Sequence, residues 1–201
     1  MGSWFEVTPG YMAMLCVMAW IDRSICISFT ASVIIHEMGH LLMLKLMGIP
    51  VRKVQLRLSG ARIDSVFFDY RKEILCAAAG PSANLLFAWI ILHRWPEVAV
   101  ISILLATANL LPIYPMDGGR LVRSGLMLIC RPECAAKASY IISFVTAIGL
   151  MITACWVTVY LQAGIWPIFA AMALLWRAGD EEKQLLFCDY AARMKKQETI
   201  K

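Results

Sequence analysis

The sequence has little charge for a chain of its length. Charged residues make up 16% of its 201 residues, apolar residues make up 60%, and the mean hydropathy is +0.68. Soluble domains carry about 25% charged and about 45–50% apolar residues. A water-soluble globular protein is therefore excluded, and the composition predicts a chain that folds in a lipid bilayer.

Three further absences narrow the class of protein. The seven cysteines are scattered without a Cys-x-x-Cys pair, so neither a zinc ribbon nor a disulfide framework is indicated. The net charge is +5, but the basic residues lie in short segments between apolar runs and do not cluster with aromatic residues, which argues against nucleic-acid binding. The first ten residues lack the cationic start of a secretory signal, so we expect none there.

The apolar runs predict an all-α polytopic membrane protein with about six transmembrane helices. The predicted spans are residues 11–21, 24–47, 74–92, 98–116 and a pair within 138–176, a stretch without any charged residue that we expect to turn around residues 162–167. The first of these runs is short for a hydrocarbon core of about 30 Å. In the third run, Pro81 would either break the helix or open a close-packing point around residues 79–81. At the end of the fourth run, Pro112 and Pro115 interrupt the helix. Residues 1–176 are thus predicted to form one transmembrane domain, followed by a short charged cytoplasmic tail over residues 177–201.

A short segment between the second and third spans alternates apolar and polar residues. Residues 54–58 have the letters V-Q-L-R-L, Ser59-Gly60 is a turn signal, and residues 61–67 alternate again. This pattern predicts a small β-hairpin or sheet. Because an open ribbon cannot satisfy its backbone in lipid, we expect it at the interface or against protein.

The lysine and arginine residues predict the orientation. Six lie within residues 48–72, four within 120–137 and six from residue 177 onward, whereas the alternate connections hold Arg23, Arg94 and none. Cytoplasmic loops carry the excess of basic residues. We therefore expect an integral membrane protein with both termini in the cytoplasm.

The second predicted span carries the motif His36-Glu37-Met38-Gly39-His40 in its middle. On a helix His36 and His40 lie one turn apart on the same face, so both imidazoles can bind one zinc ion, and Glu37 is placed to take a proton from water. A glutamate in a spanning helix costs about 2.5–3.5 kcal/mol on insertion scales. The alternative, a histidine–glutamate pair that only joins two helices, is the less favoured interpretation.

A catalytic zinc usually takes three protein ligands. The only other histidine, His93, lies on the side opposite the basic loops and is expected to be a solvated interfacial residue. Asp117 is the better candidate because it ends an apolar run, is followed by Gly118-Gly119 and lies on the same side as His40. An ordinary Asp-Gly turn at a helix end remains the alternative for this residue.

Three motifs together resemble the site-2 protease family of intramembrane metalloproteases. They are H-E-M-G-H at 36–40, A-G-P at 79–81 and N-L-L-P-I-Y-P-M-D-G-G at 109–119. The resemblance extends over most of the chain and is closest to the sporulation branch, in which a membrane protease cleaves an inactive sigma-factor precursor. Members of that branch usually carry a CBS domain and other branches a PDZ domain, and we expect neither here. Regulation of the kind such a domain provides would then be absent or supplied by separate membrane inhibitor or regulator proteins.

The resemblance implies one zinc ion held by His36, His40 and Asp117, with Glu37 as the general base. It also implies that Asn109 binds the peptide backbone of a membrane-bound protein substrate; the alternative for Asn109 is a hydrogen bond in helix packing. Asn84 is a weaker candidate of the same kind. The function expected is hydrolysis of a peptide bond in or near a transmembrane segment of the substrate.

Two other functions stay open at this point. One is a membrane zinc peptidase that acts on exposed loops and draws its third ligand from Glu73 or Glu97. The other is a non-enzymatic transporter or scaffold that uses the histidines for ion passage. A transporter needs polar residues in several spans, which the uncharged stretch 138–176 does not provide.

Overall fold

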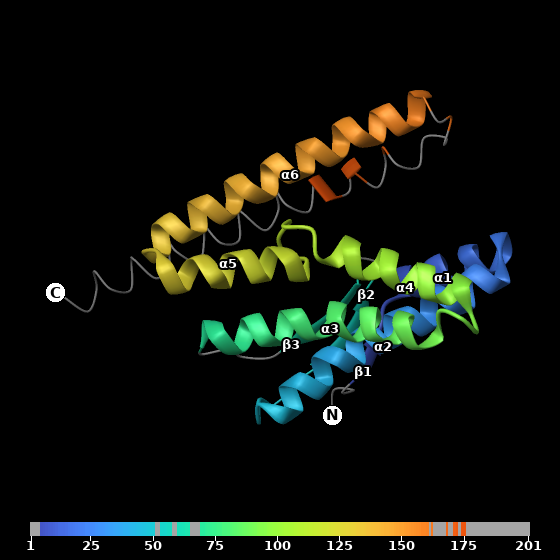
Figure 1. Ribbon diagram of the computed structural model, residues 1–201, viewed down its shortest axis with the longest axis horizontal. Coiled ribbons are helices and arrows are strands. Elements are labelled where there is room, and N and C mark those ends of the chain that lie inside the picture. Colours follow the sequence, from blue (N-terminus) through green and yellow to red (C-terminus); the bar gives the residue numbers. More distant parts are fainter. Residues whose placement is uncertain are drawn as a thin grey trace. The chain divides into compact units, whose positions relative to one another are not determined.

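The computed structural model describes residues 5–50, 53–57, 60–64, 69–160, 162, 168, 171–172 and 174–175 (Figure 1). The predicted tail, residues 177–201, lies outside the described residues. The chain divides into two compact units, Met1–Leu110 and Leu111–Lys201, and each is described by itself.

The first unit contains four helices and a small sheet. Its elements in chain order are β1 (Phe5–Val7), α1 (Pro9–Ile21), α2 (Arg23–Leu46), β2 (Lys53–Arg57), β3 (Gly60–Asp64), α3 (Tyr70–Ile91) and α4 (Pro96–Asn109). Helices α2, α3 and α4 pack against one another in all three pairings, and α1 packs on α2. They form the helical core of this unit.

The ends of these helices follow from local sequence. Pro9 and Pro96 stand in the first turns of α1 and α4, where a missing N–H is not needed. Asp22 caps α2 by accepting hydrogen bonds from the amides of Ser24 (2.7 Å) and Ile25 (3.2 Å). Beyond the end of α2, Gly48 has φ of +67°, the left-handed conformation that glycine adopts most readily.

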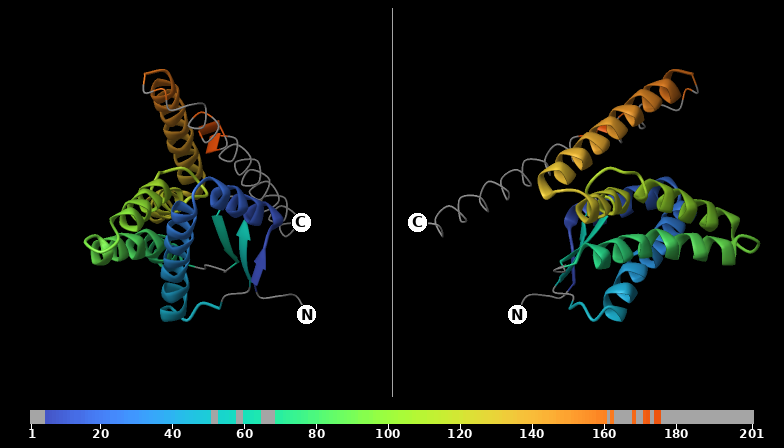
Figure 2. Two further views of the ribbon diagram at one scale, coloured as in Figure 1. Left: turned by 90° about the vertical axis from the view of Figure 1, so that its right-hand side faces the viewer. Right: turned by 60° about the vertical axis from the view of Figure 1, so that its left-hand side comes forward.

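The three strands form one sheet in the order β1-β2-β3 (Figure 2). In the segment where the sequence predicts a hairpin, β2 and β3 pair antiparallel, with Val54 opposite Ile63. The N-terminal strand β1, which sequence analysis did not predict, joins β2 in parallel, with Phe5 opposite Val54.

Helix α2 is polar on its buried face and apolar on its exposed face, the reverse of a helix in a soluble protein. Its buried residues recur every four positions and are mostly polar: Ser28, Ser32, His36, His40 and Leu44. Large apolar side chains such as Ile27, Ile34 and Leu42 are exposed. Apolar side chains on the outside and polar ones on the inside are the arrangement expected of a helix surrounded by lipid.

The second unit contains α5 (Asp117–Ile129) and α6 (Pro132–Tyr160), which pack against each other. Residues 110–116, which lead into α5, are not helical and include a cis peptide bond between Tyr114 and Pro115. The backbone amide of Tyr114 donates a hydrogen bond to the Ser143 hydroxyl on α6 (3.2 Å). Ile113 is buried beside Ala147 of α6, so this segment is packed against the helix.

Two boundaries differ from the prediction. The predicted span over residues 98–116 is helical only as far as Asn109, where α4 ends, and Pro112 and Pro115 follow in a non-helical segment, in agreement with the predicted interruption of the helix. Residues 117–129, predicted as part of a basic loop, form α5. This short helix was missed because it is amphipathic, with Arg120 and Arg123 among its apolar residues, and so does not stand out in hydropathy.

Among the described residues, three helices are long and apolar enough to cross a membrane: α2, α3 and α6. The apolar helices α1 and α4 are shorter, with 13 and 14 residues. Helix α6 ends at Tyr160, and Gln162, where a turn is expected, has φ of 49°. Ten of the sixteen residues 161–176 lie outside the described residues. The protein is thus an integral membrane protein with a largely helical fold.

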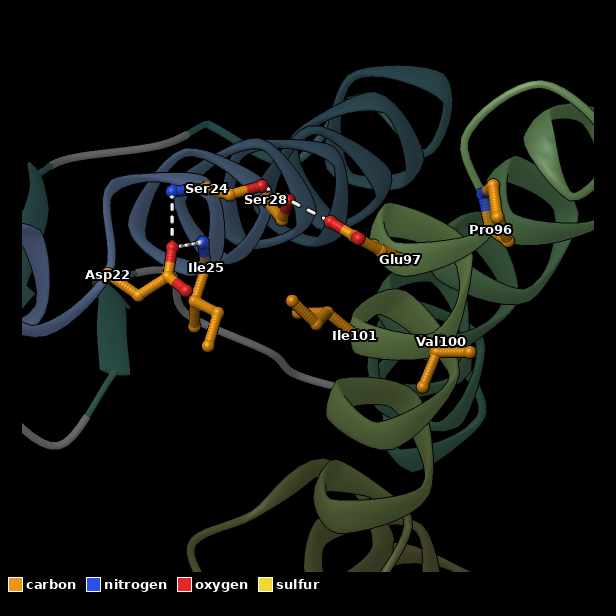
Figure 3. Close-up of a pocket in the computed structure, with 8 residues that line it drawn as sticks. All are labelled: Asp22, Ser24, Ile25, Ser28, Pro96, Glu97, Val100 and Ile101. Atoms are coloured by element: carbon orange, nitrogen blue, oxygen red, sulfur yellow. Dashed lines mark hydrogen bonds between the residues drawn. The ribbon is translucent and has the colours of Figure 1, made fainter.

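A hollow of about 590 Å³ lies between the start of α2 and the start of α4, and Figure 3 shows the residues that line it. Its wall includes a hydrogen bond that joins the two helices, from the Ser24 hydroxyl to the Glu97 carboxylate (3.2 Å). Neither histidine of α2 lines it. This hollow is therefore separate from the candidate site on the same helix.

Candidate metal centre

The two histidines of α2 face each other across one helical turn. Their Nε2 atoms are 3.1 Å apart, and the ring centroids are separated by 4.8 Å with the ring planes nearly perpendicular. Both side chains are 5% exposed. The i, i+4 spacing predicted this pairing, and the structure confirms that the two imidazoles share one face of the helix.

Helix α3 contacts the opposite nitrogen of each ring. Nδ1 of His40 is 2.8 Å from the backbone carbonyl of Cys76, and Nδ1 of His36 is 3.4 Å from Nδ2 of Asn84. Because a carbonyl can only accept, Nδ1 of His40 carries the hydrogen, and its Nε2 keeps the lone pair in the neutral ring. A nitrogen with a free lone pair is the form of histidine that binds a metal.

A glycine allows α3 to lie against the two rings. A Cβ at Gly80 would collide with Nε2 of His40 and come within 2.9 Å of Cε1 of His36. Gly39 on α2 lies equally close to α3, since a Cβ there would be 2.6 Å from the carbonyl oxygen of Ala79. The two helices therefore approach each other through glycine at the level of the histidines, which is typical of close helix packing in membranes.

The neighbouring proline, Pro81, does not break α3, so the first of the two interpretations drawn from the sequence is wrong. Pro81 lies inside the helix and is fully buried, and the helix continues to Ile91. The other interpretation, a close-packing point around residues 79–81, is confirmed by the contacts of Gly80.

Glu37 follows His36 directly on α2 and is half-buried. In H-E-x-x-H sites the glutamate in this position acts as general base toward water at the metal.

Asp117, the predicted third ligand, belongs to the second unit. It is the first residue of α5 and is 6% exposed. Its Oδ1 lies 3.7 Å from the Arg120 guanidinium one turn further along the helix. Two residues after Asp117, a Cβ at Gly119 would collide with backbone atoms of Ile113 and Tyr114. The turn that presents Asp117 thus requires glycine, and the role of Asp117 as a ligand stays a prediction.

Two other residues from the sequence analysis have defined surroundings. Asn109 is the last residue of α4, and its Nδ2 donates to the carbonyl of Leu105 in the same helix (3.0 Å). Its predicted contact with a substrate backbone is not tested by this bond. His93 is exposed in the turn after α3, as predicted for a solvated residue.

The donor geometry of the pair fits a divalent metal. Two nitrogen ligands at about 2.0–2.1 Å in tetrahedral coordination are about 3.3 Å apart, close to the observed 3.1 Å between the Nε2 atoms. The fold and this site define a class: an integral membrane protein whose first long helix carries a candidate metal centre of the H-E-x-x-H type.

Comparisons with known proteins identify the relatives of this chain. Residues 89–153 match the sequence model of Peptidase family M50. A zinc metalloprotease of Methanocaldococcus jannaschii is 28% identical over 108 residues, which are 46% of this chain and 31% of that protein. Stage IV sporulation protein FB of Bacillus subtilis is 26% identical over 161 residues, which are 71% of this chain and 54% of that protein.

The solved structure of the site-2 protease from Methanocaldococcus jannaschii matches with a TM-score of 0.65 at 20% identity and covers 86% of both chains. Identity this low establishes the fold alone. The chain spans about half the length, or less, of the curated relatives that it matches. Together these findings agree with the resemblance drawn from the motifs: part of the chain matches Peptidase family M50, and its fold is similar to that of a solved site-2 protease.

Sequence reasoning missed two contributions to the site. The Cys76 carbonyl is a backbone group, which no side-chain motif can reveal. The contact of Asn84 with His36 depends on which face α3 turns toward α2. The spacing of residues 76, 80 and 84 places them on one face of α3, but it does not say which residues of α2 that face meets.

Proposed function

We propose that this protein is a zinc-dependent intramembrane metalloprotease that hydrolyses a peptide bond in or near a transmembrane segment of a membrane-bound protein. His36, His40 and Asp117 are the proposed ligands of one zinc ion, Glu37 is the proposed general base, and Asn109 is the proposed contact for the substrate backbone. A membrane-tethered sigma-factor precursor is the substrate class that the likeness to a sporulation protein suggests.

The observation that carries the proposal is the pair of Nε2 atoms 3.1 Å apart on the buried face of α2. Two imidazoles already spaced for one metal ion need little rearrangement to bind it. They are buried among helices whose length and composition suit a membrane span, which supports a reaction within the membrane. The family match and the zinc metalloprotease among the relatives support the same chemistry.

Each residue has one task in this mechanism. When bound, zinc supplies Lewis acidity, which polarises a carbonyl and acidifies water. Glu37 takes the proton of the attacking water and passes it to the leaving amine. Asn109 holds the substrate backbone in an extended form. The substrate helix has to unwind locally, because its carbonyls are otherwise engaged in helical hydrogen bonds.

The proposed topology places this chemistry on the cytoplasmic side of a bacterial cell membrane. It has about six spans and both termini in the cytoplasm, as the distribution of basic residues predicts. Water would reach Glu37 from the cytoplasm. Separate membrane proteins are the proposed regulators.

The first test replaces Glu37 with glutamine. The purified Glu37→Gln protein is expected to keep one zinc ion per chain, measured by elemental analysis, because no ligand is changed. Cleavage of a panel of tagged single-span proteins is expected to fall by about 10²–10⁴-fold, since the general base is lost. Glu97→Gln, the same chemical change at an exposed residue of α4, is the control and should cleave normally.

Further arms of this experiment separate the alternatives. Asp117→Ala should lose zinc and cleavage together, whereas a loop-cleaving peptidase that uses Glu97 as a ligand would lose zinc in the Glu97→Gln control. Mass spectrometry of the products locates the cleaved bond relative to the substrate span. Wild-type protein without stoichiometric zinc, or full cleavage by Glu37→Gln, would overturn the proposed function.

A further inference from the structure

The amide of Asn84 is buried beside His36 without full use of its hydrogen-bonding groups. Asn84 has no exposed surface. Its Nδ2 lies 3.4 Å from Nδ1 of His36, and its Oδ1 has no hydrogen-bond partner. A buried carbonyl oxygen without a donor is unfavourable, so this side chain has a reason to turn.

The neighbouring histidine shows which arrangement suits a metal ligand. His40 donates its Nδ1–H to the Cys76 carbonyl and thereby directs the lone pair of Nε2 toward His36. For His36 to present the lone pair of its own Nε2 to the same ion, its Nδ1 must carry the hydrogen as well. That hydrogen needs an acceptor on α3, and the amide of Asn84 is in place.

A half-turn of the Asn84 amide meets both requirements. It exchanges two groups of almost equal size, so it needs no new space. The rotation brings Oδ1 to Nδ1 of His36, where the unpartnered carbonyl gains a donor. Asn84 and Cys76 then perform the same task for the two rings, from positions two helical turns apart on the same face of α3.

We propose that Asn84 is a positioning residue: its amide oxygen accepts the hydrogen bond from Nδ1–H of His36 and holds Nε2 of that ring toward the metal. The inference rests on the proposed function and assigns to Asn84 a different role from the substrate contact suggested by the sequence. Partners of this kind fix the tautomer of a ligating histidine and raise its basicity.

The test measures zinc affinity, by competition with a chelator, in the purified full-length chain. Asn84→Leu, which has a similar size and no polar group, is expected to weaken zinc binding about 10–100-fold. Asn84→Asp, which can accept from Nδ1–H, is expected to restore affinity to within about 10-fold of the wild type. Ser82→Ala, at an exposed polar residue of the same helix, is the control and should bind zinc as the wild type does.

A second measurement uses the wild-type protein and does not depend on the folding of any variant. The chain has three histidines, so nitrogen NMR of the zinc-loaded protein with labelled histidine gives few signals. His36 and His40 are both expected to bind zinc through Nε2 and to keep a hydrogen on Nδ1. Coordination of His36 through Nδ1 would overturn the inference.

The failure of this inference is distinguishable from that of the proposed function. If the wild type binds no stoichiometric zinc, the proposed function fails first. If the wild type binds zinc and folded Asn84→Leu binds it equally tightly, only the role of Asn84 is wrong. Loss of affinity in Asn84→Leu with recovery in Asn84→Asp supports the inference, because a purely structural role would not depend on the acceptor.

Discussion

The histidine pair and Asp117 are held in place in different ways. The imidazoles of His36 and His40 are fixed by a second helix, since α3 supplies a hydrogen-bonding group for each ring and a glycine between them. Asp117 is fixed by its own neighbourhood in the chain, where Gly119 lies against the backbone of residues 113–114. Two of the three proposed ligands thus depend on helix packing for their position, and the third depends on a turn.

This difference indicates which substitutions should displace the histidines and which should displace Asp117. A change in the spacing of α2 and α3 acts on the metal ligands directly, because the rings lie in that contact. A change in the turn before α5 acts first on the folding of the second unit. Glycine substitutions in the two places provide the sharpest comparison.

The largest effect is expected from Gly80→Ala. The added Cβ would collide with the His40 ring, so the imidazoles cannot keep their spacing. We expect zinc affinity to fall by more than about 100-fold, beyond the effect of losing a supporting hydrogen bond. Gly149→Ala on α6, where an added Cβ meets nothing within 4 Å, is the matched control. Unchanged zinc binding by folded Gly80→Ala would show that the rings do not lie against α3.

An intermediate effect is expected from Gly119→Ala. Its Cβ would meet backbone atoms, which cannot move aside as a flexible side chain can. Overpacking of this kind costs about 1–3 kcal/mol of stability, measured by denaturant unfolding in detergent micelles. Gly125→Ala on the same helix meets nothing and should stabilise by up to about 1 kcal/mol through helix propensity. Equal stabilities of the two variants would contradict a tight turn before α5.

The smallest effect is expected at a buried hydrogen bond between α2 and α4. The hydroxyls of Ser32 and Ser102 are 2.7 Å apart, and Ser32 donates to the carbonyl of Ser28, so Ser102 must be the donor to Ser32. A double-mutant cycle should give a coupling of about 0.6 kcal/mol, the average for such bonds in a membrane protein.

The direction of that bond makes the two single variants unequal. Ser102→Ala leaves Ser32 bonded to Ser28, whereas Ser32→Ala removes the acceptor of a buried hydroxyl. Unfolding measurements should therefore rank Ser32→Ala as the less stable variant. The opposite order would reverse the assignment of donor and acceptor.

The sequence predicts features that depend on residue spacing and local signals within one helix. The spacing of His36 and His40 determines that they share a face. Asp22 as the N-cap of α2 and Pro96 in the first turn of α4 mark where those helices begin. Long apolar runs likewise predict α2, α3 and α6. These features depend only on nearby residues, which is why they can be inferred without coordinates.

Features that depend on the contact between helices could not be inferred. Nothing in the letters around Gly80 and Asn84 says which residues of α2 they meet, because that depends on the rotation of two helices about their axes. Helix α5 was missed for another reason, since average hydropathy does not detect an amphipathic segment. The end of α4, by contrast, is close to Pro112 and Pro115, which the sequence predicts to interrupt the helix.

The junction at Asp22 has a mechanical consequence. This one residue closes α1, through its amide bonded to the carbonyl of Met18 (2.9 Å), and opens α2, through its carboxylate bonded to two amides of that helix. Asp22 is the one residue between the end of α1 and the start of α2. A tilt of α1 must either break these hydrogen bonds or move α2 as well. Because α2 carries both imidazoles, such a movement would also displace them.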